Sequence, residues 1–154
     1  MTIGIADMKI AQHDGTLITY ALGSCIGICL YDPVVKLGGL LHIMLPLNME
    51  TGRKNPLKYA DTGMAEMLRQ MEAMGANRSR MVAKIAGGAK MFEVTGGLGN
   101  IGQRNIESVR IQMKKYGLRI ANEDVGGTVA RTMSMDVQTG TITVRSYGRP
   151  DLIL

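Results

Sequence analysis

The chain reads LITYALGSCIGICLYDPVVKLGGLLHIML from residue 17 to residue 45. Two apolar runs flank Asp32-Pro33, a turn dipeptide, and glycines punctuate both runs. We interpret Leu17–Tyr31 as a strand that bends at a glycine, and Gly38–Leu45 as a second strand. The stretch therefore predicts an antiparallel hairpin that carries both cysteines and one of the two histidines of the chain.

Outside this hairpin, short apolar runs alternate with two segments of helical periodicity. Five further strands are predicted, at Ile3–Ile10, Met81–Ala86, Leu118–Ala121, Thr128–Val137 and Thr141–Tyr147. One helix begins at Pro56, with Asn55 as its N-cap, and stops before Gly75 as its C′ residue. A second spans Gln103–Tyr116, and residues 47–55 are a polar loop. Because hairpins outnumber strict βαβ units, we predict an α+β fold. It is a layered α/β sandwich of mixed, largely antiparallel strands with about two main helices, in one domain over residues 1–154.

The hairpin suggests how Cys25 and His42 meet. If residues 32–35 form a four-residue loop, paired positions sum to 67, and 25 + 42 places Cys25 opposite His42. Directly opposed residues on one face have Cβ atoms about 4.5–5.5 Å apart, which allows a thiol to bond an imidazole. A slip of one residue would send one of the two groups to the other face.

The residues around Cys25 suit a nucleophile. Gly23 or Gly27 permits a sharp bend, and Gly23 and Ser24 would supply backbone N–H groups to an oxyanion. A nearby imidazole would hold the thiol as thiolate. Each residue alone is more often a buried core residue, so the prediction rests on the pairing and the bend.

The second cysteine serves as a contrast. Cys29 lies four strand residues beyond Cys25, about 13 Å away, so both sulfurs cannot bind one ion. We expect Cys29 in the core and His13 in an exposed turn. With two Cys and two His in the chain, we expect no metal site and no cofactor.

Composition restricts the compartment and the partners. No apolar run is long enough to span a membrane, and no signal peptide is visible, so a cytoplasmic protein is expected, with no membrane insertion. The net charge is −2 over residues 1–50 and +7 over residues 51–154, which sums to +5. The basic residues are scattered with few aromatics, which argues against nucleic acid. A solvated surface is the simplest interpretation, and an acidic protein partner is the next.

One glycine-rich motif is also typical of dinucleotide-binding proteins. Residues 97–102, GLGNIG, match G-x-G-x-x-G, and Glu123 follows 21 residues later, as in dinucleotide-binding proteins. The preceding segment is short and charged, and a second nucleotide-binding half is missing. A tight loop before a helix is therefore favoured over an oxidoreductase.

Several motifs together resemble the CheD family. They are Leu22-Gly23-Ser24-Cys25, Asp32-Pro33, His42-Ile43-Met44-Leu45-Pro46, Gly87-Gly88-Ala89, Ile101-Gly102-Gln103-Arg104-Asn105, Asp124-Val125-Gly126-Gly127 and Arg131. They occur in order over nearly the whole chain, which makes the set specific.

The resemblance implies a function and a site. CheD proteins are cysteine-dependent deamidases that convert glutamine to glutamate on bacterial chemoreceptors, and they bind the phosphatase CheC. The family's catalytic set is a cysteine, a histidine and a threonine, which correspond here to Cys25, His42 and Thr19, the last placed by spacing alone. The expected substrate is the receptor's cytoplasmic helices. The alternative is a non-enzymatic adaptor that binds a CheC-type phosphatase.

The segment Gly97–Asn105 is a candidate contact surface. Its glycines would let a partner approach the backbone closely. We hypothesise that Arg104 and Asn105 line the rim of the site and contact the receptor or CheC, although a structural turn remains the plainer reading.

Overall fold

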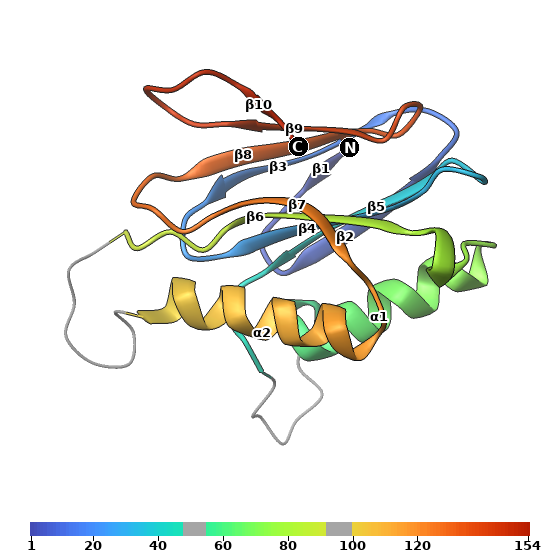
Figure 1. The fold of residues 1–154 in the computed structure, drawn as a ribbon, viewed down its shortest axis with the longest axis horizontal. Helices are drawn as coiled ribbons and strands as arrows, with labels where there is room; N and C mark the ends of the chain where they lie inside the picture. The colour runs from blue at the N-terminus through green and yellow to red at the C-terminus, as the bar shows by residue number, and fades with distance from the viewer. Residues whose placement is uncertain (48–54, 92–99) are drawn as a thin grey trace.

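The computed structural model describes residues 1–47, 55–91 and 100–154, which form three layers (Figure 1). Two five-stranded sheets stack face to face, and two helices cover the free face of one of them. The predicted α+β sandwich, with mixed and largely antiparallel strands, is confirmed. Most of the predicted loop at residues 47–55 lies outside the described residues.

The outer sheet has the order β1-β3-β8-β9-β10. Its strands are β1 (Thr2–Ile3), β3 (Thr16–Leu22), β8 (Arg131–Asp136), β9 (Thr141–Arg145) and β10 (Leu152–Ile153). Among the described strands of this sheet, β1 and β3 pair in parallel and the other neighbours are antiparallel.

The central sheet has the order β2-β5-β4-β6-β7. Its strands are β2 (Asp7–Gln12), β5 (Leu37–Ile43), β4 (Ile26–Asp32), β6 (Val82–Gly87) and β7 (Ile120–Val125). β6 and β7 are parallel, and the other pairs are antiparallel. Because β4 and β5 are buried along their whole length, this sheet separates two apolar clusters, one under the helices and one between the sheets.

The helices are α1 (Ala60–Ala73) and α2 (Ile101–Lys115), and two 3-10 turns, η1 (Pro56–Lys58) and η2 (Arg78–Arg80), precede β6. The side chain of Asn55 caps η1 by accepting a hydrogen bond from the N–H of Leu57 at 3.0 Å. Methionines of α1 pack on the central sheet in place of aromatic residues, which suits their flexible side chains.

Two predicted strands are each divided. Ile3–Ile10 forms β1 and β2, separated by a turn in which Ala6 has φ 55°, so its halves belong to different sheets. Leu17–Tyr31 likewise forms β3 and β4, and the break falls at Gly23-Ser24-Cys25. These divisions and the short β10 raise the expected seven strands to ten among the described residues.

The predicted register of the hairpin is wrong by two residues. Gly27, not Cys25, lies opposite His42, because Asp32 pairs with Leu37 and the loop is residues 33–36. Asp32 is buried, and its carboxylate binds Arg80 at 2.8 Å, which keeps Asp32 at the end of the strand. A shift of two residues preserves the alternation of faces, so Cys25 and His42 still belong to the same side of the sheet.

Candidate active site

Cys25 lies in the bend through which the chain crosses from the outer to the central sheet. β3 ends at Leu22 and β4 begins at Ile26, so Cys25 is the last residue of the bend and is partly exposed. The N–H of Ala89 donates to the carbonyl of Gly23 at 2.8 Å, and that of Gly88 donates to the carbonyl of Cys25 at 2.9 Å. The segment after β6 therefore fixes the shape of the bend.

This close fit requires glycine after β6. Gly87 has φ 117°, and a Cβ atom there would lie 2.2 Å from the carbonyl oxygen of Cys25. Gly88 has φ 70°, and a Cβ atom there would lie 2.5 Å from a side-chain carbon of Ile106. Gly87 therefore cannot accept an L side chain unless the bend moves, and at Gly88 the side chain of Ile106 would have to move.

Thr19 and His42 form a buried pair between the sheets. Thr19, on β3, donates its hydroxyl hydrogen to the carbonyl of Ile3 at 2.8 Å, and its oxygen also lies 2.8 Å from Nδ1 of His42. A hydroxyl has one hydrogen, so this second contact requires Nδ1 of His42 to donate. In the neutral ring Nε2 then carries the lone pair, which is the arrangement of a general base.

His42 Nε2 is buried and has no hydrogen-bond partner among the described residues. The imidazole projects from β5 toward the outer sheet, the side on which Cys25 also packs. Opposite His42 stands Gly27, where a Cβ atom would lie 2.8 Å from the sulfur of Met133. Because Gly27 has no side chain, the apolar cluster between the sheets can pack closely next to the imidazole of His42.

Burial sets the protonation states. It raises the pKa of the Cys25 thiol, and the backbone N–H of Cys25 offsets part of that rise. Burial lowers the pKa of His42 to about 4, while the carboxylate of Asp7, its neighbour across β2 and β5, opposes this more weakly. Both groups are therefore neutral at neutral pH, so Cys25 is a thiol and His42 an unprotonated imidazole.

Two of the expected roles do not fit the structure. Asn105 is fully buried on the inner face of α2, so it cannot line an exposed rim. The N–H of Gly23 already donates to the carbonyl of Ala21 at 3.0 Å, so it is not free for an oxyanion. The N–H of Ser24 meets no acceptor within the described ranges. Arg104 is exposed, in the first turn of α2.

A buried ion pair behind the bend was not predicted from the sequence. Arg131, on β8, binds Asp124 at 2.9 Å and donates to the carbonyls of Gly126 at 2.8 Å and Gly87 at 3.3 Å. The N–H of Gly126 also donates to the carbonyl of Gly87. The motifs Gly87-Gly88, Asp124–Gly127 and Arg131 thus meet behind Cys25. The sequence does not predict this contact, because the residues that form it lie far apart along the chain.

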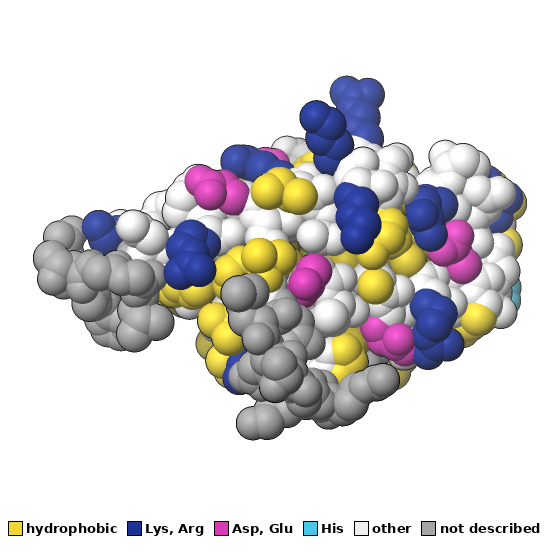
Figure 2. All heavy atoms as spheres, turned by 90° about the horizontal axis from the view of Figure 1, so that it is seen from below, with side chains coloured by type: hydrophobic (Ala, Val, Ile, Leu, Met, Phe, Trp, Pro, Cys, Tyr) yellow, Lys and Arg dark blue, Asp and Glu magenta, His cyan; other side chains and the backbone are white. Residues whose placement is uncertain are grey.

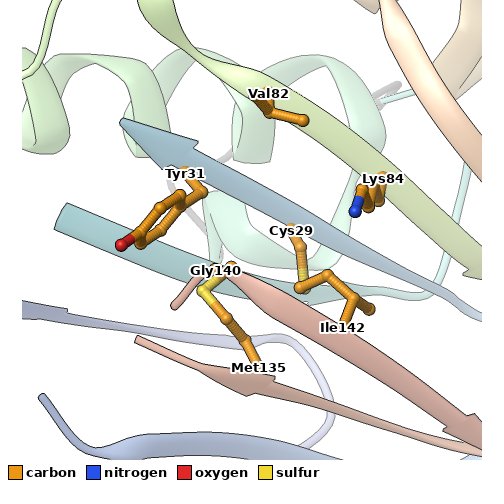
Figure 3. A pocket seen from close by; sticks show the side chains of 7 residues that line it. All are labelled: Cys29, Tyr31, Val82, Lys84, Met135, Gly140 and Ile142. Atoms are coloured by element: carbon orange, nitrogen blue, oxygen red, sulfur yellow. The ribbon is translucent and has the colours of Figure 1, made fainter. Parts of the chain in front are cut away.

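Two hollows among the described residues are lined by neither Cys25 nor His42. A cavity of about 140 Å³ opens between the sheets and is lined by Cys29, Tyr31, Lys84 and Met135, among others (Figure 3). No histidine lines it, and burial raises the pKa of Cys29, so its thiol is unreactive at neutral pH. Cys29 is buried as expected, and His13 is exposed in a turn with φ 73°. A shallower hollow of about 340 Å³ runs past Ala21 and Arg131.

The structure describes only part of the glycine motif and places other features that the sequence analysis singled out. The glycines at 97 and 99 lie outside them, and Gly102 packs against the carbonyl of Ala89. Glu123 pairs with Arg110. The face formed by the helices mixes basic, acidic and apolar side chains (Figure 2). None of the described helices has the length and apolarity to cross a bilayer.

Comparison with known proteins gives a consistent result. A family model described as CheD chemotactic sensory transduction matches residues 44–146. A protein of Desulforamulus reducens named probable chemoreceptor glutamine deamidase CheD is 46% identical over 154 residues, which cover 96% of this chain and 91% of that protein. A Thermotoga maritima protein named chemoreceptor glutamine deamidase CheD is 42% identical over 148 residues, 95% of this chain and 91% of its own. A Pyrococcus abyssi protein with the name of the first is 43% identical over 145 residues, 93% of this chain and 89% of its own.

Proposed function

The chain belongs to the CheD family, and from that premise we propose that it deamidates glutamine side chains of bacterial chemoreceptors with Cys25 as nucleophile. The observation that carries the proposal is the buried pair of Thr19 and His42, which leaves an unpartnered Nε2 on the side of the sheet where Cys25 packs. The names of the relatives supply the substrate class.

The first half of the reaction is attack on the amide. As the sulfur of Cys25 bonds to the glutamine Cδ, its proton moves to Nε2 of His42, and the carbonyl becomes an oxyanion. The proton then passes to the amide nitrogen, the C–N bond breaks, and ammonia leaves a thioester on Cys25. Thr19 acts as a positioning residue, because its oxygen holds Nδ1 and so keeps Nε2 able to accept.

The second half is hydrolysis. Water loses a proton to Nε2 of His42 and adds to the thioester, the C–S bond breaks, and the sulfur recovers the proton as glutamate leaves. The sum is glutamine plus water giving glutamate plus ammonia. Because Gly23 is already bonded, the N–H groups of Ser24 and Cys25 are the oxyanion donors in this scheme.

The surroundings of the site suit a protein substrate. Ile5, Tyr20 and Met91 are exposed apolar side chains on segments that flank the site. Met91 reaches the bend itself, since a Cβ atom at Gly23 would lie 3.1 Å from its side chain. Because Cys25 is itself partly exposed, an exposed glutamine on a helical surface can approach its thiol, which fits the receptor's cytoplasmic helices.

Intact-mass spectrometry of a receptor fragment tests the proposal. Each deamidation replaces an amide NH2 by OH, so the mass rises stepwise, and peptide mapping locates the change. The unmodified protein and the Cys29→Ala variant should produce the change, and Cys25→Ala should not. A receptor fragment whose mass is unaltered by the unmodified protein contradicts the proposed activity.

The adaptor function is the competing proposal. An adaptor that binds a CheC-type phosphatase would bind equally well with Cys25→Ala and would leave receptor mass unchanged. The contact with Thr19 fixes the tautomer of the buried His42 ring and leaves Nε2 able to accept a proton. This favours catalysis, because an adaptor has no need of such an atom.

A further inference from the structure

Asn105 lies where its side chain can act on the candidate site as well as stabilise the fold. α2 can approach the bend because Gly102 lacks a Cβ atom, which would lie 2.6 Å from the carbonyls of Gly88 and Ala89. One helical turn further on, Asn105 is fully buried at the junction of the bend with the end of β5.

The side-chain amide of Asn105 spans the two halves of the site. Its Nδ2 donates one hydrogen bond to the carbonyl of Ser24 and one to the carbonyl of Met44, both at 2.9 Å. Ser24 precedes Cys25, and Met44 follows His42 by two residues. Both contacts are carbonyl oxygens, so the nitrogen, not the oxygen, must face them.

The contact with Ser24 bears on the nucleophile directly. The carbonyl of Ser24 and the N–H of Cys25 belong to one planar trans peptide, in which the two groups point in opposite directions. Asn105 draws the carbonyl inward beneath α2, so the N–H is turned away from the helix, toward the sulfur of Cys25, whose pKa it lowers. A hydrogen bond to the carbonyl also polarises the peptide and strengthens the N–H as a donor.

We propose that Asn105 is a positioning residue for the deamidation reaction. It holds the Ser24–Cys25 peptide with its N–H directed at the oxyanion, and it ties that peptide to the strand of His42. The inference rests on the proposed function, because the oxyanion forms only in acyl transfer.

Ser108 provides a matched control for this inference. It lies one turn further along the same face of α2, is also buried, and donates to the carbonyl of Pro46 at 2.7 Å. Ser108→Ala therefore removes a buried bond between α2 and the segment after β5 without touching the bend.

The experiment compares Asn105→Ala, the isosteric Asn105→Asp and Ser108→Ala. The rates of two reactions are measured for each variant and expressed per folded molecule. One is receptor deamidation, and the other is alkylation of Cys25 by iodoacetamide, which needs the sulfur but forms no oxyanion. Both Asn105 variants should lower kcat for deamidation on the order of 100-fold with KM within about twofold. Alkylation depends on that N–H only through the pKa of the thiol, on which burial acts more strongly, so it should stay within about threefold of the unmodified protein. Ser108→Ala should preserve both rates.

Three results overturn the inference. They are a kcat of the Asn105 variants within threefold of the unmodified protein, an equal loss in deamidation and alkylation, and failure of both variants to fold. The last two would make Asn105 a structural residue only. If the unmodified protein fails to deamidate the receptor, the proposed function fails instead, and the two failures are thus distinguished.

Discussion

At the scale of single residues, the proposed chemistry rests on Thr19 and His42. The one hydroxyl hydrogen of Thr19 goes to the carbonyl of Ile3, and this fixes which ring nitrogen of His42 carries a hydrogen. Burial then keeps the ring uncharged, since an imidazolium between the sheets would lose most of its hydration. The base is thus ready to accept a proton over a wide range of pH.

The activity should therefore persist in acid further than a typical histidine base allows. His42 is a base only when unprotonated, and its pKa is lowered to about 4, so kcat/KM should fall only near pH 4 and not near 6.5. Asp7→Asn removes a charge that raises this pKa, so the limb should move to still lower pH. Initial rates of ammonia release against pH measure both effects.

Folding must be followed over the same range. Because the pKa of His42 is lower in the folded chain, the unfolded chain binds more protons below pH 6.5, and the stability contributed by this group is lost as pH falls through 4. Circular dichroism at each pH separates unfolding from titration of the base. A limb near pH 6.5 in folded protein would contradict the assigned role of His42.

The bend between β3 and β4 is the decisive feature at the scale of elements. It joins the two sheets, and the backbone of residues 87–89 and the amide of Asn105 hold it. Arg131 and Asp124 in turn hold Gly87. The position of Cys25, the proposed nucleophile, thus depends on β6, β7, β8 and α2, although none of them carries a proposed reacting group.

The variant Gly87→Ala tests this dependence. The added Cβ atom would meet the carbonyl of Cys25 at 2.2 Å, so the bend must shift, and a shift near 1 Å can reduce kcat/KM about 100-fold. Gly75→Ala is the control, because Gly75 also has positive φ but a Cβ atom there meets nothing within 4 Å. It should lower stability by about 1–2 kcal/mol and leave turnover per folded molecule unchanged. Turnover by Gly87→Ala equal to that of the control would refute the account of the bend.

The hairpin shows what the sequence can and cannot predict. Apolar runs and Asp32-Pro33 identify β4 and β5, and alternation places Cys25 and His42 on one face. The register is missed by two residues because a buried ion pair of Asp32 with Arg80, distant in sequence, sets where the loop begins. The division at Gly23–Cys25 into two sheets is missed for a similar reason, since contacts with residues 87–89 impose it.

The sequence likewise predicts only part of the candidate site. Spacing alone points to Thr19, and motifs point to Cys25 and His42. The roles of Asn105 and Arg131 depend on burial and on bonds to backbone carbonyls, which no periodicity records. Polar residues in a motif suggested surface contacts for Asn105, whereas the fold places it in the interior.

At the scale of the whole molecule, the proposed substrate is a protein and must meet a surface as well as a thiol. α2 places Arg104 in its first turn, exposed and beside the buried Asn105 that reaches the bend. The net charge of +5 favours an acidic partner. Arg104 is therefore a candidate contact for the receptor or for a CheC-type phosphatase.

Arg104→Ala should weaken turnover of receptor protein about tenfold, in the range of one partly desolvated charged contact. A small amide substrate, which does not reach α2, should react as before. Lys114→Ala removes the same charge from the exposed far end of α2 and is the control. Binding and turnover at two salt concentrations complete the test, and a match between Arg104→Ala and the control in every assay would exclude the contact.

The central claim is that Cys25, and not Cys29, is the nucleophile of a receptor deamidase. Mass spectrometry of one receptor fragment, treated in parallel with the unmodified protein, Cys25→Ala and Cys29→Ala, tests it most directly. We predict deamidated glutamine with the unmodified protein and with Cys29→Ala, and an unchanged fragment with folded Cys25→Ala. Deamidation by the Cys25→Ala variant at the rate of the unmodified protein would contradict the account.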